Sequence, residues 1–231
     1  MQMIKDNISN INRHINSICQ RLGISSDDIT LIGITKYVDS SKIKEIIDGG
    51  VTNIGENIVK DAAKKFSELG DYAKNVTKHL VGHLQTNKAK EAVAVFDLIQ
   101  SVDRLKLACE INKHAINQNK IVNVLIQVNT SCEAQKSGVE KEHALALIKD
   151  ISGLKNIRIL GLMTVAMLSE DKGIIRKNFK DLRILRDEVK SAFRGSEQIQ
   201  MKYLSMGMSA DYEIAIEEGA NMIRIGRAIT Q

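Results

Sequence analysis

The sequence predicts an α/β protein that forms a single (β/α)8 TIM-type barrel with an extra N-terminal helix. Two observations support this prediction. Short apolar runs alternate strictly with helical patterns along the chain, and this alternation is typical of a parallel sheet covered by helices. Eight such units within 231 residues suit a closed barrel near the lower end of the usual size range, and we expect residues 1–231 to form one domain.

The first three elements can be placed from periodicity and helix caps. Isoleucine recurs every three or four residues in Met3–Leu22, which predicts an amphipathic helix that ends at the following glycine. The β-branched run Thr30–Thr35 predicts the first strand. Ser40–Asp48 predicts the next helix, with Ser40 or Ser41 as its N-cap.

The same alternation continues to the end of the chain. The further strand candidates are Thr52–Ile54, His79–Gly82, Phe96–Gln100, Val122–Val128, Ile157–Leu162, Lys202–Ser205 and Met222–Ile225. The helical patterns between them are Ile58–Leu69, Asn87–Val95, Arg104–Asn117, Glu140–Ile151, Gly173–Phe193 and Ser209–Glu218. An open doubly wound sheet is the alternative, but the phosphate fingerprint G-x-G-x-x-G is missing after the first strand, which disfavours it.

Composition disfavours several classes of function. The chain has 33 Lys and Arg against 28 Asp and Glu, a net charge of +5, with the two signs interleaved and only 3% aromatic residues. We therefore expect no nucleic-acid binding. No apolar run approaches the roughly 18 residues that span a bilayer, and the N-terminus has no apolar signal-peptide core, so we expect a cytoplasmic protein that binds no membrane. Metal-ligand and disulfide spacings are absent among the cysteines, which predicts reduced thiols at Cys19, Cys109 and Cys132.

Lys36 follows the first strand, and functional residues of such barrels come from the C-terminal ends of strands. An amine must be neutral to attack an aldehyde, and at the reference lysine pKa of about 10.4 only about 0.04% is neutral at pH 7. Apolar walls or a nearby cation increase that fraction, so a desolvated lysine at a strand end is a candidate for a Schiff base. From position alone, an ordinary solvated lysine is the alternative.

Two polar residues follow the next two strands. Asn57 either caps the helix that follows it or points towards a ligand. His83 follows the third strand, and a single histidine is more often a hydrogen-bonded structural group than a catalyst. No second histidine or carboxylate stands at metal-ligand spacing, so we expect no metal site.

The most specific local signal follows the seventh and eighth strands. Ser205 and Gly207 end the seventh strand, and Arg224, Gly226 and Arg227 end the eighth. Loops at these places commonly bind phosphate through backbone N–H groups and a helix N-terminus, and glycine permits a close approach of the backbone. We therefore predict a phosphate site here; turn glycines beside a surface arginine are the alternative.

Several motifs stand in a characteristic order along nearly the whole chain. They are Gly33-Ile-Thr-Lys36, Ile54-Gly-Glu-Asn57, His79-Leu-Val-Gly-His83-Leu-Gln-Thr-Asn-Lys88, Val124-Leu-Ile-Gln-Val-Asn129, Lys136-Ser-Gly138, Gly161-Leu-Met-Thr164, Leu204-Ser-Met-Gly-Met-Ser-Ala-Asp211 and Ile223-Arg-Ile-Gly226. Each motif alone is weak, but together they resemble the pyridoxal 5′-phosphate (PLP) homeostasis protein family, whose fold is that of the alanine racemase N-terminal domain.

The resemblance implies that PLP is held as an imine on Lys36. It also implies phosphate contacts from Ser205, Gly226 and the backbone of Arg227, and it places Arg224 opposite the pyridine nitrogen. The other residues that it implies to line the cofactor pocket are Asn57, His83 and Met163.

Arg224 has a consequence for function within this resemblance. A guanidinium stays protonated and does not stabilise a protonated pyridine nitrogen, so the ring is a poorer electron sink than one paired with a carboxylate. A non-catalytic carrier in PLP homeostasis is the favoured function, with PLP-dependent apo-enzymes as candidate partners and a monomer as the expected state. A PLP-dependent racemase is the alternative, but its second base comes from a C-terminal β-domain in fold relatives, whereas this sequence ends at the eighth strand.

Three segments depart from the family pattern. Val165-Ala166-Met167 follows Gly-Leu-Met-Thr, where the family soon has a proline, and Arg227 stands where it has a threonine. The last four residues, 228–231, replace Ala-Ile-Phe-Gly with Ala-Ile-Thr-Gln. The hydroxyl contact of that threonine is therefore in doubt, whereas the backbone contact is not. Arg227 either adds a charge to the phosphate site or points into solvent.

Overall fold

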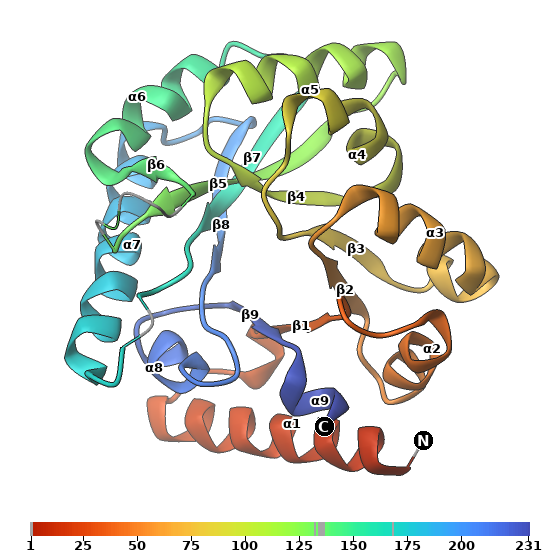
Figure 1. The fold of residues 1–231 in the computed structure, drawn as a ribbon. Helices are drawn as coiled ribbons and strands as arrows, with labels where there is room; N and C mark the ends of the chain where they lie inside the picture. The colour runs from red at the N-terminus through yellow and green to blue at the C-terminus, as the bar shows by residue number, and fades with distance from the viewer. Residues whose placement is uncertain (1, 132, 134–136, 168) are drawn as a thin grey trace.

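The structure is a computed structural model that describes residues 2–131, 133, 137–167 and 169–231 (Figure 1). Two residues named above, Cys132 and Lys136, lie outside the described residues.

In the described part of the chain, eight parallel strands close into the predicted barrel (Figure 1). The sheet has the order β4-β3-β2-β1-β9-β8-β7-β5-β6, and the pairing of β4 with β5 closes it. The barrel strands are β1 (Thr30–Ile34), β2 (Asn53–Glu56), β3 (Thr77–Leu80), β4 (Leu98–Val102), β5 (Val122–Asn129), β7 (Ile157–Met163), β8 (Ile199–Ser205) and β9 (Met222–Ile225). A two-residue strand that the pattern did not indicate, β6 (Val139–Glu140), pairs with the end of β5.

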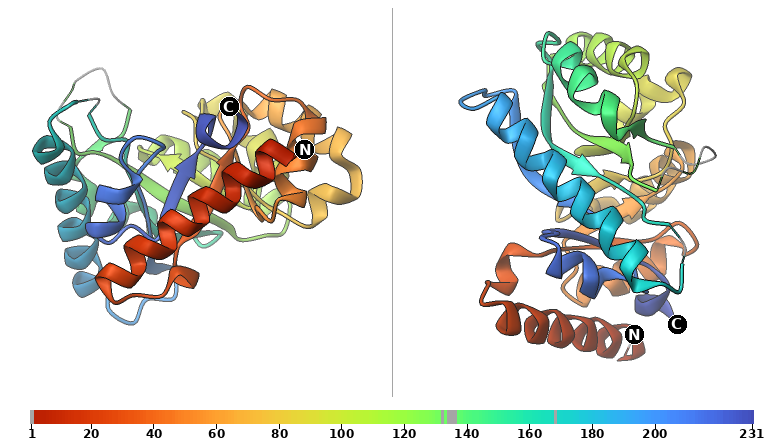
Figure 2. Two further views of the ribbon diagram at one scale, coloured as in Figure 1. Left: turned by 90° about the horizontal axis from the view of Figure 1, so that it is seen from below. Right: turned by 90° about the vertical axis from the view of Figure 1, so that its left-hand side faces the viewer.

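Helices surround the barrel, as Figures 1 and 2 show from three directions. They are α1 (Gln2–Leu22), α2 (Ser40–Asp48), α3 (Val59–Leu69), α4 (Ala89–Val95), α5 (Leu105–Asn117), α6 (Lys141–Ile151), α7 (Lys172–Ala192), α8 (Tyr212–Glu217) and α9 (Arg227–Thr230). Short 3-10 helices are η1 (Ser26–Asp28), η2 (Gly70–Lys74) and η3 (Thr86–Lys88). Among the described residues, none of the helices combines the length and apolar character that a membrane span requires.

The extra helix α1 forms where the isoleucine spacing predicts it. Its apolar face is buried, and Gly23 follows it with a φ of +68°, the left-handed conformation that glycine adopts without strain. The side-chain amide of Asn7 donates to the carbonyl oxygen of Ile229 at 3.1 Å. The C-terminus therefore lies against the first helix (Figure 2).

One prediction about a helix cap is wrong, and one alternative left open at a second cap is excluded. Asp39, rather than Ser40 or Ser41, caps α2: its backbone is extended, and its carboxylate accepts the N–H three residues further on. Helix α3 begins after Ile58 without a side-chain cap, so Asn57 does not cap it. Several cap-forming residues precede each helix, and the pattern does not show which of them adopts the extended conformation that a cap requires.

Strand alternation separates two buried layers. The large apolar core lies between the helices and the outer face of the barrel. A smaller apolar cluster lies inside the barrel and consists of Ile32, Leu98, Leu125, Met163 and Met222. Polar side chains share this interior, and they bear on the functional site.

Candidate functional site

The strand order brings Lys36 next to the two glycine loops. Strand β9 lies between β1 and β8, so the loops that follow these three strands are neighbours at the C-terminal end of the barrel. Gly226, just after β9, lies against the end of β1: a Cβ placed on it would be 3.5 Å from the carbonyl oxygen of Ile34. The structure therefore places the loop that carries Gly226 beside the end of β1, two residues before Lys36.

Lys36 lies in the turn after β1, and its side chain is exposed. Its Nζ stands 4.8 Å from the centroid of the Tyr37 ring, and Tyr37 is itself 84% exposed. The side chain therefore stands in solvent, the alternative that position alone allowed, and the role of Lys36 as the imine-forming amine stays a prediction. The exposure follows from the backbone: β1 ends at Ile34, Thr35 is buried, and the turn carries Lys36 outwards.

A buried ion pair holds the backbone immediately before Lys36. Glu56, at the end of β2, is 1% exposed. Its Oε1 accepts from the Thr35 hydroxyl at 2.6 Å and from Lys65 Nζ at 2.8 Å. The Lys65 amine also donates to the carbonyl oxygen of Thr35 at 2.7 Å. Because that carbonyl belongs to the peptide group joining Thr35 to Lys36, the pair fixes the point from which the Lys36 side chain departs.

A series of hydrogen bonds, here called the interior chain, crosses the barrel from β9 to β2. Arg224 Nη1 donates to Ser205 Oγ at 2.7 Å, and this hydroxyl donates to Gln100 Oε1 at 2.6 Å. The amide nitrogen of Gln100 lies 3.0 Å from His79 Nδ1. His79 Nε2 lies 3.0 Å from Asn53 Oδ1. Four of the five residues are buried and Asn53 is half-buried, so almost no water competes for these bonds.

The chemistry of the donors gives the interior chain one direction. The amide oxygen of Asn53 can only accept, so His79 carries its proton on Nε2 and leaves Nδ1 to accept from Gln100. The oxygen of Gln100 then accepts from Ser205, whose own oxygen accepts from Arg224. Burial lowers the pKa of His79 to about 4, so the ring is neutral at pH 7, as this arrangement requires.

Arg224 is a buried cation at the inner wall of the barrel. Its Nη2 donates to the carbonyl oxygen of Thr164 at 2.7 Å. Burial lowers its pKa to about 10, and the negative charge of Asp211 opposes the shift, so the guanidinium stays charged at neutral pH. Each Nη atom carries two N–H groups, and the bonds to Ser205 and Thr164 use one on each. Further donors are therefore available to a ligand with a lone pair.

Two predicted site residues lie inside the barrel. The Ser205 hydroxyl is fully buried, and it already donates one hydrogen bond and accepts another within the interior chain. The structure thus shows Ser205 as a support of Arg224, and its contact with phosphate stays a prediction. Met163 belongs to the interior apolar cluster and is 1% exposed.

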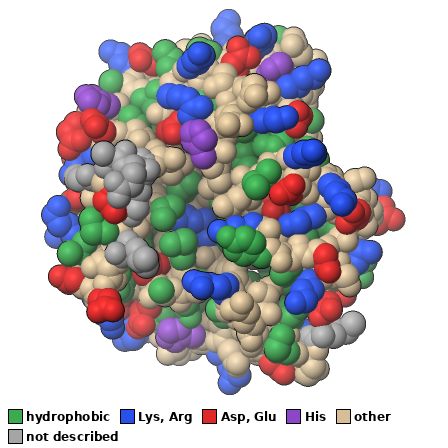
Figure 3. Space-filling model, viewed as in Figure 1, with side chains coloured by type: hydrophobic (Ala, Val, Ile, Leu, Met, Phe, Trp, Pro, Cys, Tyr) green, Lys and Arg blue, Asp and Glu red, His purple; other side chains and the backbone are tan. Residues whose placement is uncertain are grey.

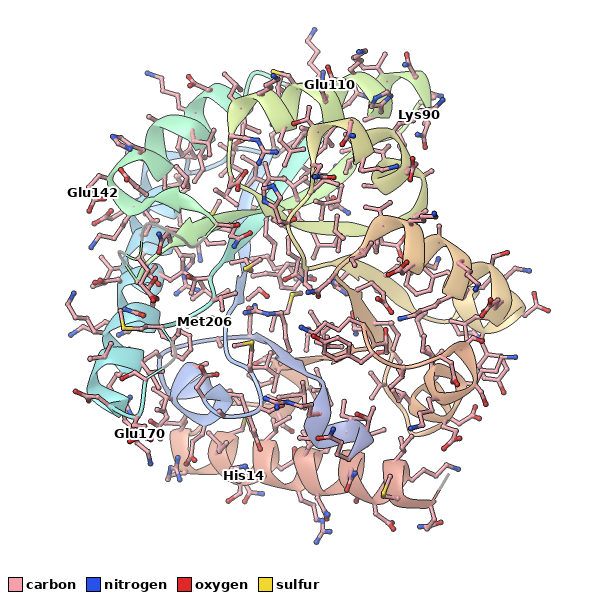
Figure 4. All side chains as sticks on the ribbon, viewed as in Figure 1. His14, Lys90, Glu110, Glu142, Glu170 and Met206 are labelled. Carbon is pink, nitrogen blue, oxygen red and sulfur yellow. The ribbon has the colours of Figure 1, made fainter. Side chains whose placement is uncertain are left out.

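The glycines that follow β8 and β9 have different surroundings. Gly207 has a φ of +93°, and a Cβ on it would lie 2.6 Å from the Cβ of Ala215, so the fold itself requires glycine there. Its neighbour Met206 is fully buried beside α8 (Figure 4). A Cβ on Gly226 would meet no atom closer than 3.5 Å. The chain's own packing therefore leaves room over Gly226.

Arg227 is exposed and is the first residue of α9. The first N–H groups of a helix have no acceptor within it, so the N–H groups of Arg227 and Ala228 are available to an anion. Phosphate binding by the backbone at this position stays a prediction, and the exposed Arg227 side chain places a positive charge nearby. In the view of Figure 1, the surface in the middle of the molecule carries Lys and Arg side chains among hydrophobic ones (Figure 3).

Asn57 and His83 lie on the loops after β2 and β3, which pack together. A Cβ on Gly82 would be 2.3 Å from the carbonyl oxygen of Asn57, so glycine is needed where the two backbones meet. The His83 side chain is 47% exposed, and its Nδ1 lies 3.8 Å from Asp103 Oδ2. Among the described residues, no group of three or more His, Cys, Asp or Glu stands in a position to hold a metal ion.

The predicted site residues occupy one continuous arc of the barrel. In sheet order, the arc runs β3, β2, β1, β9, β8 and β7. The residues along it are His83, Asn57, Lys36, the group Arg224, Gly226 and Arg227, the pair Ser205 and Gly207, and finally Met163. Two residues that hold site residues in place were not predicted from the sequence. Lys65, which binds the carbonyl oxygen before Lys36, belongs to no motif. Gln100, which accepts from Ser205, is the polar end of an apolar run.

Comparison with known proteins settles the family. The family model for the alanine racemase N-terminal domain matches residues 3–231. The pyridoxal phosphate homeostasis protein of Aquifex aeolicus (strain VF5) is 38% identical over 221 residues, which make up 96% of this chain and 94% of that protein. The chain belongs to the pyridoxal phosphate homeostasis protein family. The family resemblance and the fold predicted from the sequence are both confirmed.

Two solved structures share the fold of nearly the whole chain. The crystal structure of a protein from Bifidobacterium adolescentis superposes with a TM-score of 0.94 at 33% identity, covering 99% of this chain and 94% of its own. PipY from Synechococcus elongatus PCC7942, solved with PLP bound, superposes with a TM-score of 0.84 at 29% identity, covering 99% of this chain and all of its own (100%). A relative with the same fold has therefore been solved with PLP bound.

Proposed function

We propose that this protein binds PLP and acts in the cytoplasm as a non-catalytic carrier in PLP homeostasis, as a monomer with one domain. The observation that carries the proposal is the adjacency of the strands β1, β9 and β8. An exposed lysine follows β1, a buried arginine lies on β9, and a glycine loop follows each of β9 and β8. The family's name and the PLP-bound structure of PipY support the identity of the ligand. The residues present fit PLP, because they offer an amine, an anion cradle and a hydrogen-bond donor within one arc.

Each of these groups has a separate task in the proposal. PLP supplies an aldehyde that condenses with amines. The neutral amine of Lys36 adds to the aldehyde carbon, an imine forms and water leaves. Backbone N–H groups at Gly226 and Arg227 receive the phosphate, and the side chain of Arg227 adds a charge. Asn57, His83 and Met163 line the pocket between these ends.

Arg224 favours a carrier over a transaminating enzyme. Its guanidinium is charged at neutral pH and donates N–H groups, so it binds a pyridine nitrogen that carries no proton. An unprotonated ring withdraws electrons weakly, which disfavours transamination and suits a carrier, or at most a racemase-like proton transfer. Holding the aldehyde reversibly needs no such withdrawal, and PLP-dependent apo-enzymes would be its recipients.

Borohydride reduction tests the proposal directly. Reduction of the yellow PLP-loaded protein should fix a pyridoxyl group on Lys36, located by peptide mapping. Lys65 is an internal control, since its amine is half-buried and donates to Glu56 and Thr35. A label on Lys65 or on another lysine, or no label at all, would contradict the proposal.

A racemase assay tests the non-catalytic part. With saturating PLP, common amino acids should show no change in optical rotation above the background of PLP alone. Robust turnover would replace the carrier with a PLP-dependent racemase as the better description.

A further inference from the structure

The direction in which Arg224 points depends on two neutral oxygen atoms. Its guanidinium bonds to Ser205 Oγ and to the carbonyl oxygen of Thr164, both at 2.7 Å. The carbonyl is fixed by the strand, but a serine hydroxyl rotates and can turn either its proton or its lone pairs towards a neighbour. The acceptor that takes the serine proton therefore decides whether Arg224 meets a lone pair.

That acceptor is Gln100. Its Oε1 lies 2.6 Å from Ser205 Oγ, and its amide nitrogen lies 3.0 Å from His79 Nδ1. If the amide were turned over, its oxygen would face the lone pair of Nδ1 and its NH2 group would face the serine. His79, held by Asn53 at 3.0 Å, therefore locks the amide of Gln100 in the orientation that accepts from Ser205.

Gln100 reaches this position from the opposite side of the barrel. In the closed sheet, β4 and β9 are separated by the same number of strands in both directions. Apolar side chains such as Leu98 and Met222 also lie in the barrel interior beside it, and a buried amide there is costly unless its hydrogen bonds are satisfied. An apolar residue would serve the packing alone, so the amide has a use beyond packing.

We propose that Gln100 is a positioning residue for the cofactor, which sets the Ser205 hydroxyl so that Arg224 is held towards the pyridine nitrogen. The inference rests on the proposed function, since it assumes that PLP lies against Arg224. Gln100 itself touches neither the amine of Lys36 nor the glycine loops, and it acts through Ser205 alone.

The test compares Gln100→Leu with Ser101→Ala in the full chain. Ser101 is the next residue on β4, is fully buried, and has a hydroxyl with no hydrogen-bond partner among the described residues, so it is a matched control on the same strand. In the PLP-loaded protein, Gln100→Leu should shift the visible absorbance maximum and the pH at which the imine titrates. It should also weaken PLP retention by about tenfold, as expected for a hydrogen bond to a charged group. Ser101→Ala should match the wild type in all three.

A second measurement keeps the inference separate from the proposed function. Nitrogen-15 NMR of the cofactor-free wild type should show His79 with its proton on Nε2; a proton on Nδ1 would overturn the inference whatever the protein binds. A wild type that binds no PLP would instead refute the proposed function.

Two results with the loaded protein would also overturn the inference. One is a folded Gln100→Leu variant with the spectrum and retention of Ser101→Ala. If Gln100→Leu does not fold, Gln100→Met, which keeps an unbranched side chain but removes the acceptor for Ser205, should show the same shift and the same weaker retention, and a folded Gln100→Met variant that matches Ser101→Ala would overturn the inference.

Discussion

The interior of the barrel and its rim differ in how far the fold has fixed them. In the interior chain, each side chain from Arg224 to His79 is buried and bonded on both sides. On the rim, the side chains of Lys36, His83 and Arg227 are exposed. Polar groups away from water need partners, whereas exposed ones are satisfied by solvent.

This difference assigns separate energetic roles to the two regions. In the proposed function, the interior groups would meet the pyridine ring already oriented, so that little conformational freedom would be lost there on binding. The rim would offer the long amine side chain of Lys36 to the aldehyde. Substitutions in the interior chain or in the buried Glu56–Lys65 pair should therefore lower mainly the stability of the fold. Substitutions on the rim should lower PLP binding while leaving stability unchanged.

Breaking the buried pair beneath Lys36 should have the largest effect on stability. Lys65→Met leaves Glu56 as an unpaired buried carboxylate, and we expect a loss of about 3–5 kcal/mol in the free energy of unfolding, measured by chemical denaturation. The adjacent Lys64 is 79% exposed and lies 3.9 Å from Glu68 on the surface, so Lys64→Met should change stability by less than about 0.5 kcal/mol. Equal losses in the two variants would show that the pair does not hold the turn.

Acid should weaken the interior chain through His79. Its pKa in the folded state, about 4, lies below the reference value of 6.5, so the unfolded state binds the proton more readily between these values. Stability is fully present above about pH 6.5 and falls by about 3 kcal/mol as the pH drops to about 4. Denaturation at several pH values should show this loss in the wild type and not in His79→Gln.

The exposed His83 provides the control for this titration. His83→Gln should keep the pH profile of the wild type, because its side chain is 47% exposed. If His83→Gln flattened the profile and His79→Gln did not, the titrating group would belong to the rim, and the contrast between the regions would fail.

The two glycines should separate stability from binding. Gly207→Ala forces a side chain into a positive φ and against Ala215, so we expect it to lose about 2 kcal/mol of stability. Gly226→Ala has room within the chain and should change the thermal unfolding temperature little, while weakening PLP binding because the new methyl group meets the phosphate. Similar unfolding temperatures for both variants, or unchanged PLP affinity in Gly226→Ala, would contradict this assignment.

Much of the fold was predictable because alternation and periodicity are properties of whole segments. The isoleucine stripe of Met3–Leu22 and the eight apolar runs have no competing interpretation at that scale. The errors concern single residues. Asp39, Ser40 and Ser41 are all good caps, and the choice among them depends on the backbone path. The short elements β6 and α9 carry too few residues for a period.

The sequence predicted only those residues of the candidate site that directly follow the end of a strand. Lys36 and Gly226 follow strands, so the closed barrel brings them together regardless of other details. Gln100 and His79 lie within strands. A polar residue inside an apolar run shows that the run is interrupted, but it does not indicate a hydrogen-bond partner. Their partners are set by register and by the barrel's diameter, which no local pattern contains. Lys65 lies on a helix, and its partner Glu56 is found only once α3 packs against β2.

Replacing Lys36 by alanine tests the central claim most directly. Because its side chain is exposed, the variant should unfold within about 0.5 kcal/mol of the wild type. In the same preparation it should lose the visible absorbance of the imine and bind PLP far more weakly in a titration. A folded Lys36→Ala variant that keeps both the colour and the affinity of the wild type would contradict the account.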